Sequence, residues 1–122
     1  GEQVAYANIL TKKYHQDPDV LIVQEWLETN YNNRIVVSDL PLLVNLTLRT
    51  FNRRFKKATE LNALEYLQTL RIEAAKKQLE TTHDSIERIV SQVGYDDLSS
   101  FTRLFKKHTG LSPSQYAKKF KR

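Results

Sequence analysis

Two stretches of this chain, LRTFNRRFKKATELNALEY at residues 48–66 and LSSFTRLFKKHTGLSPSQY at residues 98–116, follow one pattern. Such self-similarity indicates that one supersecondary unit occurs twice. A solenoid needs about three or more stacked units to bury a continuous core, so we expect two similar subdomains in one compact chain. Nine residues recur unchanged fifty positions later: Leu48, Phe51, Arg53, Phe55, Lys56, Lys57, Thr59, Leu61 and Tyr66 match Leu98, Phe101, Arg103, Phe105, Lys106, Lys107, Thr109, Leu111 and Tyr116.

The positive charge of the chain lies with these repeats. The 122 residues contain 19 Lys and Arg and 14 Asp and Glu, a net charge of +5. Residues 1–36 hold three basic and five acidic side chains, whereas residues 37–122 hold sixteen and nine. A surface that binds a polyanion such as nucleic acid has this distribution. An excess of lysine also occurs on surfaces that are only solvated, so charge alone does not decide the function.

The composition argues against a metal site and against catalysis. The chain has no cysteine, which excludes a disulfide, a thiolate nucleophile and a cysteine-based zinc site. His15, His83 and His108 lie far apart in the sequence, and we expect them to be solvated. The carboxylates form no convergent pair, and no nucleophile has a nearby base. We therefore predict no cofactor and no enzymatic activity.

The chain also lacks the segments that direct a protein to or through a membrane. No apolar run approaches the roughly 18–20 residues of a membrane span, and no signal peptide is present. We expect a cytoplasmic protein. The sequence begins at Gly1 and contains no methionine, which predicts a fragment of a longer protein, with Gly1 a cloning remnant and an N-terminal partner domain missing.

Helix signals recur along the chain, and no segment alternates as a strand does, so we predict an all-α fold of seven helices. The expected N-caps are Asp17, Ser38, Thr47, Asn62, Asp84 or Ser85, Asp97 and Ser112, and the expected helix ends lie near Asn30, Val44, Ala58, Glu80, Gly94, Lys107 and Phe120. Apolar residues mark the inner faces. In the second and fourth helices we expect Leu40, Leu43, Val44, Leu64, Leu67, Ile72, Ala75 and Leu79 to face inward.

The helices divide into four segments. We interpret residues 1–16 as an interdomain linker, 17–61 as a first helix-turn-helix subdomain, 62–80 as a linker helix and 81–122 as a second helix-turn-helix subdomain. At 1.5 Å per residue the linker helix is roughly 27 Å long, enough to hold two subdomains apart. Asn45 and Gly94 are expected to take the left-handed conformation that turns the chain between the two short helices of each subdomain.

The second helix of each pair has an apolar stripe beside a polar arc. Leu48, Phe51 and Phe55 form the stripe in the first copy, and Leu98, Phe101 and Phe105 form it in the second. The polar arc covers roughly 100° of each helix. Arginine can pair with guanine, asparagine with adenine, and serine or threonine with either base in a major groove. The arcs contain Arg49, Asn52, Arg53 and Lys56, then Ser99, Thr102, Arg103 and Lys106.

Other interpretations of these residues exist. The four phenylalanines could stack on single-stranded bases, although their spacing on the apolar face favours a core role. The paired lysines at 56–57 and 106–107 could serve only solubility. Arg53 and Arg103 keep their place beside different neighbours, which favours a functional role, although a repeated structural ion pair would explain them equally.

The second copy resembles the C-terminal signature of the AraC/XylS transcription regulators. The stretch Arg71–Ala75 through Leu79 resembles the linker helix of that family, so the resemblance extends over about residues 20–122. The first copy departs from the family pattern at Pro41, Asn45 and Glu60. The resemblance rests on Ser85, Ile89-Val90, Val93-Gly94-Tyr95, Phe101, Arg103, Phe105-Lys106-Lys107, Thr109-Gly110-Leu111-Ser112-Pro113 and Tyr116.

The resemblance implies two recognition helices in the major groove of double-stranded DNA, and a regulator that recruits or blocks RNA polymerase. It places Arg49, Asn52, Arg53, Ser99, Ser100, Thr102 and Arg103 at base-facing positions. It places Lys56, Lys57, Lys106 and the helix N-termini at Thr47 and Asp97 near phosphates, with Asp97 suited only to capping. A narrower similarity, to members fused behind a DJ-1/PfpI-like domain, implies that the missing N-terminal domain is a sensor.

A nonspecific or architectural nucleic-acid binder is the alternative function. Basic helix faces would serve such a protein equally well. The two functions differ in whether binding survives competitor DNA at physiological salt, because specific sites are typically held ~10³–10⁷-fold more tightly. The leading hypothesis is sequence-specific binding to an asymmetric site.

Overall fold

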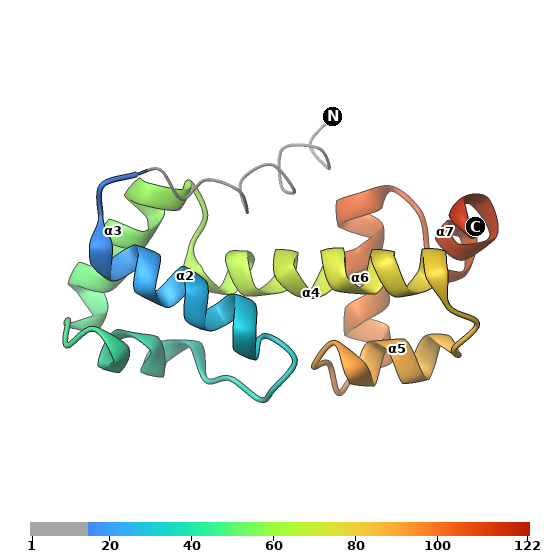
Figure 1. The fold of residues 1–122 in the computed structure, drawn as a ribbon, viewed down its shortest axis with the longest axis horizontal. Helices are drawn as coiled ribbons and strands as arrows, with labels where there is room; N and C mark the ends of the chain where they lie inside the picture. The colour runs from blue at the N-terminus through green and yellow to red at the C-terminus, as the bar shows by residue number, and fades with distance from the viewer. Residues whose placement is uncertain (1–14) are drawn as a thin grey trace.

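A computed structural model describes residues 15–122, which form seven helices and no strand. The predicted all-α class is therefore confirmed, while the segment predicted as a linker lies mostly outside the described residues. Figure 1 shows α4 as the axis of an elongated molecule with a group of helices at each end. The elements are α2 (Pro18–Asn30), the 3₁₀ helix η1 (Val37–Leu43), α3 (Leu48–Thr59), α4 (Ala63–Thr81), α5 (Ile86–Gln92), α6 (Leu98–Thr109) and α7 (Pro113–Phe120).

Side-chain caps start the helices where the sequence predicts them. The carboxylate of Asp17 accepts a hydrogen bond from the Val20 N–H, with Pro18 at the first helical position. Capping boxes begin α4 and α7, because the cap side chain and the side chain three residues later each bond to the other's backbone N–H. The pairs are Asn62 with Glu65 and Ser112 with Gln115. These local signals place the helix starts within one turn.

The second helix is the exception. Ser38 is predicted to cap an α-helix, and this is wrong, because η1 begins at Val37 and its N-cap is Val36, two residues before the predicted cap. Val36 makes no side-chain cap hydrogen bond. Ser38 then lies inside the helix, where it cannot cap its start. The segment takes the tighter 3₁₀ form, with Pro41 and its missing N–H inside it. Leu43, expected to face inward, is exposed.

The long helix α4 contributes to both cores. Tyr66 and Leu67 lie in the core formed with α2, η1 and α3, whereas Ile72, Ala75 and Leu79 lie in the core formed with α5, α6 and α7. Each half of α4 therefore belongs to a different helical group. Leu64 departs from the expectation, because it precedes the first inward-facing turn and 49% of its side chain is exposed.

The same aromatic arrangement occurs in both cores. In each, two phenylalanines one helical turn apart lie against each other, and the second of them meets a tyrosine edge-on. Their burial confirms the prediction that the phenylalanines are core residues and contradicts a base-stacking role. The ring centroids are 5.5 Å apart for Phe51–Phe55 and 5.4 Å for Phe55–Tyr66, against 5.7 Å for Phe101–Phe105 and 5.3 Å for Phe105–Tyr116.

The histidines are less solvated than the sequence suggests. His108 is only 6% exposed in the second core region, where burial, and to a lesser degree Lys107 and Lys76, lowers its pKa. His15 is half-buried and hydrogen-bonded to Gln24 at 2.6 Å. The expectation of three solvated histidines is therefore wrong for His108 and incomplete for His15, because their burial depends on helices distant in the sequence.

Candidate nucleic-acid interface

Each copy of the repeat folds as a short helix, a turn and a second helix. Asn45 and Gly94 have φ values of 54° and 98°, which confirms the left-handed conformation predicted for both turns. The turns close in the same way. The Leu46 N–H donates to the Pro41 carbonyl at 3.2 Å, and the Tyr95 N–H donates to the Val90 carbonyl at 3.0 Å. The second helix of each unit is α3 in the first copy and α6 in the second.

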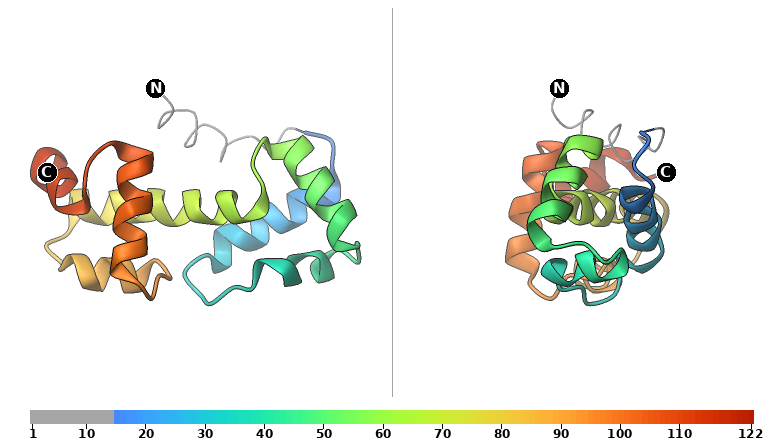
Figure 2. Two further views of the ribbon diagram at one scale, coloured as in Figure 1. Left: turned by 180° about the vertical axis from the view of Figure 1, so that it is seen from behind. Right: turned by 90° about the vertical axis from the view of Figure 1, so that its left-hand side faces the viewer.

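These two helices lie on the same side of the molecule. Figure 2 shows α3 and α6 in front of α4, one at each end of it, and the end-on view places both on the side away from α2. Their cores anchor them there through Phe51 and Phe55 in α3 and Phe101 and Phe105 in α6. The polar arcs of both helices are thus available to one extended partner.

The predicted recognition residues of α3 are all exposed. Their exposure follows from the helical period, because Phe51 and Phe55 occupy the opposite, buried face. Leu48, expected to continue the buried stripe, is 48% exposed because it begins the helix beyond the edge of the core. The exposed residues are Thr47, Arg49, Asn52, Arg53 and Lys56.

The arc of α6 is more mixed. Ser99, Arg103 and Lys106 are exposed, whereas Ser100 and Thr102 are half-buried. Leu98 corresponds to Leu48 and is also exposed, at 38%, so the predicted stripe is one residue too long in both copies.

A small polar network surrounds the start of α6. The Asp97 carboxylate accepts hydrogen bonds from the Ser99 N–H at 3.0 Å and from the Ser100 hydroxyl at 2.7 Å, and the Arg103 guanidinium donates to the Ser100 hydroxyl at 3.4 Å. The Ser100 hydrogen bond is the main reason that the pKa of Asp97 is lowered. Asp97 therefore stays negatively charged at the N-terminus of α6. The corresponding cap of α3, Thr47, carries no charge.

The two repeated arginines are not committed to ion pairs with the described residues. Salt bridges between residues 15–122 involve Arg54, Lys76, Arg88 and Arg122, but neither Arg53 nor Arg103. This removes support for the structural ion pair that would otherwise explain their repetition. Both arginines are exposed within the polar arcs.

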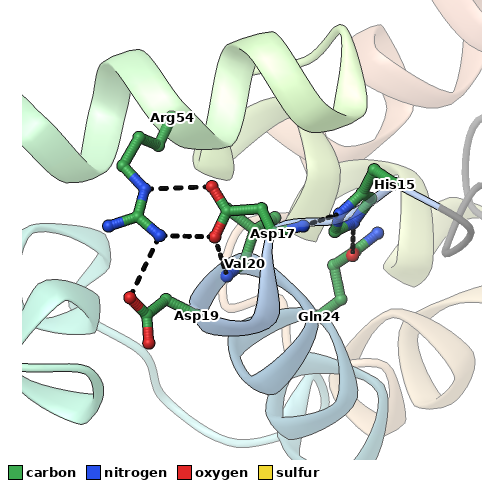
Figure 3. A network of polar contacts seen from close by, with 6 residues as sticks. All are labelled: His15, Asp17, Asp19, Val20, Gln24 and Arg54. Atoms are coloured by element: carbon green, nitrogen blue, oxygen red, sulfur yellow. Dashed lines mark hydrogen bonds and ion pairs between the residues drawn. The ribbon is translucent and has the colours of Figure 1, made fainter.

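Arg54, next to the predicted recognition residue Arg53, has a structural role that the sequence did not reveal. Its Nε donates to Asp17 at 2.9 Å, and its Nη2 donates to Asp17 at 2.6 Å and to Asp19 at 3.0 Å (Figure 3). The Arg54 hydrogen bond holds the pKa of Asp17 below its ordinary value, against the effect of burial. One signal was available: the repeat changes here, because Leu104 occupies the corresponding position.

The residues before α2 are connected to the same network. The Asp17 N–H donates to His15 Nδ1 at 3.2 Å, so Nε2 carries the proton that is shared with the Gln24 carbonyl oxygen. Figure 3 shows this chain of contacts continuing from Arg54 through Asp17 to His15 and Gln24. The helix α3 is therefore linked through Arg54 to the start of α2 and to His15 before it.

Within residues 15–122, no group of three His, Cys, Asp or Glu side chains could hold a metal ion. None of the helices in this range is both long enough and apolar enough to cross a membrane. The chemistry of the surface is that of hydrogen-bond donors and positive charge on α3 and α6, which suits an anionic partner with readable polar edges.

Comparison with known proteins agrees with this surface. A family model described as a helix-turn-helix domain matches residues 43–119. The raffinose operon transcriptional regulatory protein RafR of Pediococcus pentosaceus is 34% identical over 93 residues, which are 76% of this chain and 34% of the length of that relative. The chain thus spans about a third of the length of that relative.

Solved structures show the same fold. The C-terminal domain of the two-component response regulator yesN from Fusobacterium nucleatum is 31% identical with a TM-score of 0.74, covering 79% of this chain and 94% of that one. The DNA-binding domain of AdpA, a global transcriptional factor solved in complex with a target DNA, is 25% identical with a TM-score of 0.81. That match covers 85% of this chain and 94% of the AdpA domain.

Proposed function

The chain belongs to the AraC/XylS family of helix-turn-helix transcription regulators, which bind DNA, and on this premise we propose that α3 and α6 read two successive major grooves of one duplex. The observation that carries the proposal is the placement of both helices on one side of α4 (Figure 2). The polar arc of α3 is exposed, and that of α6 is exposed at Ser99, Arg103 and Lys106. Recognition helices on one face of DNA lie about one helical turn, ~34 Å, apart.

Base-facing roles fall to the polar arcs. In α3 they belong to Arg49, Asn52 and Arg53, and in α6 to Ser99, Ser100, Thr102 and Arg103. The support is that these residues lie outside the buried phenylalanine stripe, exposed except for the half-buried Ser100 and Thr102. In addition, no salt bridge joins the described residues to Arg53 or Arg103. Ser100 would act through Arg103 as well as directly, because its hydroxyl already accepts from that guanidinium.

Phosphate contacts would surround the base-facing residues. Lys56, Lys57 and Lys106 extend the exposed basic face of each helix, and the N-terminus of α3 at Thr47 offers free backbone N–H groups to a phosphate. The N-terminus of α6 is different, because the Asp97 carboxylate occupies it. We expect closer phosphate contact at the first helix than at the second.

Differences between the copies favour specific binding over the nonspecific alternative. The cores and the repeated arginine are the same in both, yet Arg49 is replaced by Ser99 and Asn52 by Thr102. Exposed residues of different hydrogen-bonding chemistry would select different bases in the two half-sites. A nonspecific binder would need only charge at these positions. We therefore infer an asymmetric DNA site.

In a longer regulator this module would be one of several parts. We propose an N-terminal sensor domain, contact with RNA polymerase, a cytoplasmic location with the DNA, and no catalytic step in this module. The support is that the chain spans 34% of RafR and 38% of the Msm operon regulatory protein of Streptococcus mutans. The similarity to members with a DJ-1/PfpI-like sensor rests on the sequence alone.

The test begins with selection of bound sites from random duplex DNA. On the selected site, Arg53→Ala and Arg103→Ala should each weaken binding by about 1–3 kcal/mol and relax the preference at different base pairs. Lys56→Ala should lower affinity on every sequence and reduce the salt slope by about one. Lys118→Ala removes one charge from α7, away from the proposed face, and serves as the control. Unchanged base preference in Arg53→Ala would show that the assigned face is wrong.

A further inference from the structure

Besides sharing α4, the two helical groups also meet between the loop after α2 and the turn that contains Gly94. The loop after α2 and the turn between α5 and α6 lie side by side next to the middle of α4, as Figures 1 and 2 show. Gly94 is at the point of contact. A Cβ added to it would lie 2.8 Å from the Tyr31 carbonyl oxygen and 3.1 Å from Asn32 Cα, and its φ of +98° also disfavours a side chain. The approach of the two backbones therefore requires glycine.

Arg71 fills the junction between these segments. From the middle of α4, its Nε donates to the Tyr31 carbonyl at 2.7 Å and its Nη2 donates to the Asn33 carbonyl at 2.9 Å. Tyr31 is the C-cap of α2, where carbonyl groups lack helical partners and the helix dipole favours a cation. Arg71 thus belongs to α4, which both groups share, and donates hydrogen bonds to carbonyl groups at and just after the end of α2 in the first group.

The same guanidinium also contacts the second group. It lies over the Tyr95 ring, 5.3 Å from the centroid, and the Tyr95 ring meets the Phe101 ring edge-on at 5.4 Å. Phe101 is the buried anchor of α6. A continuous series of contacts therefore runs from the end of α2 through Arg71 and Tyr95 to the second recognition helix.

The position of Arg71 along α4 makes it the boundary between the cores. Leu70 packs against the first core, and Ile72 lies in the second. Each group can follow its own half of α4 if that helix bends, and bending near this residue would change the angle between α3 and α6. Contacts from Arg71 and Gly94 to the loop after α2 oppose such bending.

We propose that Arg71 and Gly94 are positioning residues that fix the angle between the two recognition helices and so restrict the protein to DNA sites of one half-site spacing. This inference rests on the proposed function, since spacing matters only if both helices read DNA. The alternative is that α4 alone is stiff enough to set the geometry. The two explanations predict different results when the Arg71 guanidinium is removed and α4 is left intact. The angle between the recognition helices becomes variable under the first and stays fixed under the second.

The first experiment compares DNA sites. Arg71→Ala should bind each isolated half-site as the wild type does, but bind the best composite site about tenfold more weakly. It should also lose less affinity than the wild type when one base pair is inserted between the half-sites. Arg71→Lys, which keeps the charge but lacks the separate Nε and Nη2 donors that bond the two carbonyls, should fall between them. Arg88→Ala, an exposed arginine of α5, should behave as the wild type.

The second experiment needs no DNA. Because the chain contains no cysteine, Glu25→Cys and Glu87→Cys can carry a pair of spin labels on exposed sites of α2 and α5. The distance distribution should be narrow in the wild-type background and broader with Arg71→Ala. Circular dichroism would establish that the variants are folded, and Arg71→Lys serves if Arg71→Ala is not.

The outcomes separate the two proposals. An unchanged distance distribution in a folded Arg71 variant, with wild-type dependence on half-site spacing, would overturn the positioning role and leave α4 as the sole determinant. A wild-type protein that ignores half-site spacing would instead overturn the proposed function, and the distance distribution would still decide whether Arg71 fixes the angle between the groups.

Discussion

The first recognition helix is attached to its neighbours partly through charge, whereas the second is attached at the same position by apolar packing. Arg54 of α3 forms ion pairs with Asp17 and Asp19, and its counterpart in α6, Leu104, packs against the second core. At this position each helix contacts the rest of its subdomain, through ion pairs in one half and through apolar packing in the other. The first half thereby acquires a dependence on pH that the second half lacks at this position.

The core tyrosines differ in a similar way. The Tyr66 hydroxyl accepts a hydrogen bond from Gln24 at 3.2 Å, and burial raises its pKa to about 12. The Tyr116 hydroxyl donates to the Glu80 carboxylate at 2.6 Å, and burial together with Glu80 raises its pKa further. Both rings occupy the same place against a phenylalanine, so the packing is repeated while the polar partner is local to each half.

Both recognition helices end in a residue with the left-handed backbone conformation. Glu60 and Gly110 follow α3 and α6 with φ values of 70° and 81°. Glycine adopts this left-handed conformation without strain, whereas glutamate does not. The turn before α6 is also one residue longer, since Asp96 has no counterpart between Leu46 and Thr47. The first half keeps the same geometry with less suitable residues.

The largest expected effect tests the part of the comparison in which the halves are alike. Phe51→Ala and Phe101→Ala should each lower the free energy of unfolding of their own half by about 3–5 kcal/mol, because each ring is fully buried in its core. Circular dichroism measures the total loss, and fluorescence of the single tryptophan, Trp26, follows the first half. Leu98→Ala, on an exposed side chain, is the control. An unchanged melting temperature for Phe101→Ala would contradict the shared core.

The next largest effect compares the repeated threonines Thr59 and Thr109, which differ in how deeply they are buried. The Thr59 hydroxyl lies 2.9 Å from the Phe55 carbonyl and accepts from the Leu61 N–H at 3.2 Å, and Thr109 repeats these contacts. Thr59→Val leaves that buried N–H without its acceptor and should cost about 1–3 kcal/mol. Thr109→Val should cost less, because Thr109 is only half-buried. Chemical denaturation of the two variants would test the order, and equal losses would count against it.

Glycine at position 60 should make the first half more like the second. We expect Glu60→Gly to stabilise the protein by about 1 kcal/mol, because it relieves a left-handed non-glycine residue. Asn45→Gly should gain only a few tenths, since asparagine tolerates this conformation. Thermal unfolding would measure both. A loss of stability in Glu60→Gly would mean that the contacts of the glutamate side chain outweigh the backbone strain.

The smallest effect concerns the charge that distinguishes α3. The pKa of Asp17 is lowered in the folded state, so its stabilising contribution is complete above the ordinary value of 3.8 and is lost as the pH falls through the lower folded value. Asp17→Asn keeps a good helix cap but removes this dependence. Its melting temperature should therefore fall less steeply with acid than that of the wild type. If the melting temperatures of the two proteins changed in parallel between pH 2 and 6, the ion pairs of Asp17 would contribute nothing measurable to stability. Many exposed ion pairs contribute nothing measurable.

The sequence by itself determined the features whose causes lie within a few residues. The caps at Asp17, Asn62 and Ser112 and the left-handed turns at Asn45 and Gly94 follow from hydrogen bonds and φ preferences inside one turn of chain. Helical period placed the phenylalanines in the cores. It was less accurate at helix starts, where Leu48 and Leu98 extend beyond the core, and at η1, which is a 3₁₀ helix and not the expected α-helix. The recognition residues are exposed as a consequence of the same period, and their contacts with bases stay a prediction.

Only the tertiary structure decided which distant groups meet. Arg54 reaches Asp17 across 37 residues, and Arg71 reaches Tyr31 across 40. A long polar side chain on a helix surface has several partners within reach, and no local rule selects among them. The selection depends on how the helices pack, and that packing follows from the summed burial of two separate cores rather than from any short segment. The angle between the two recognition helices, and with it the DNA spacing proposed here, belongs to this second class.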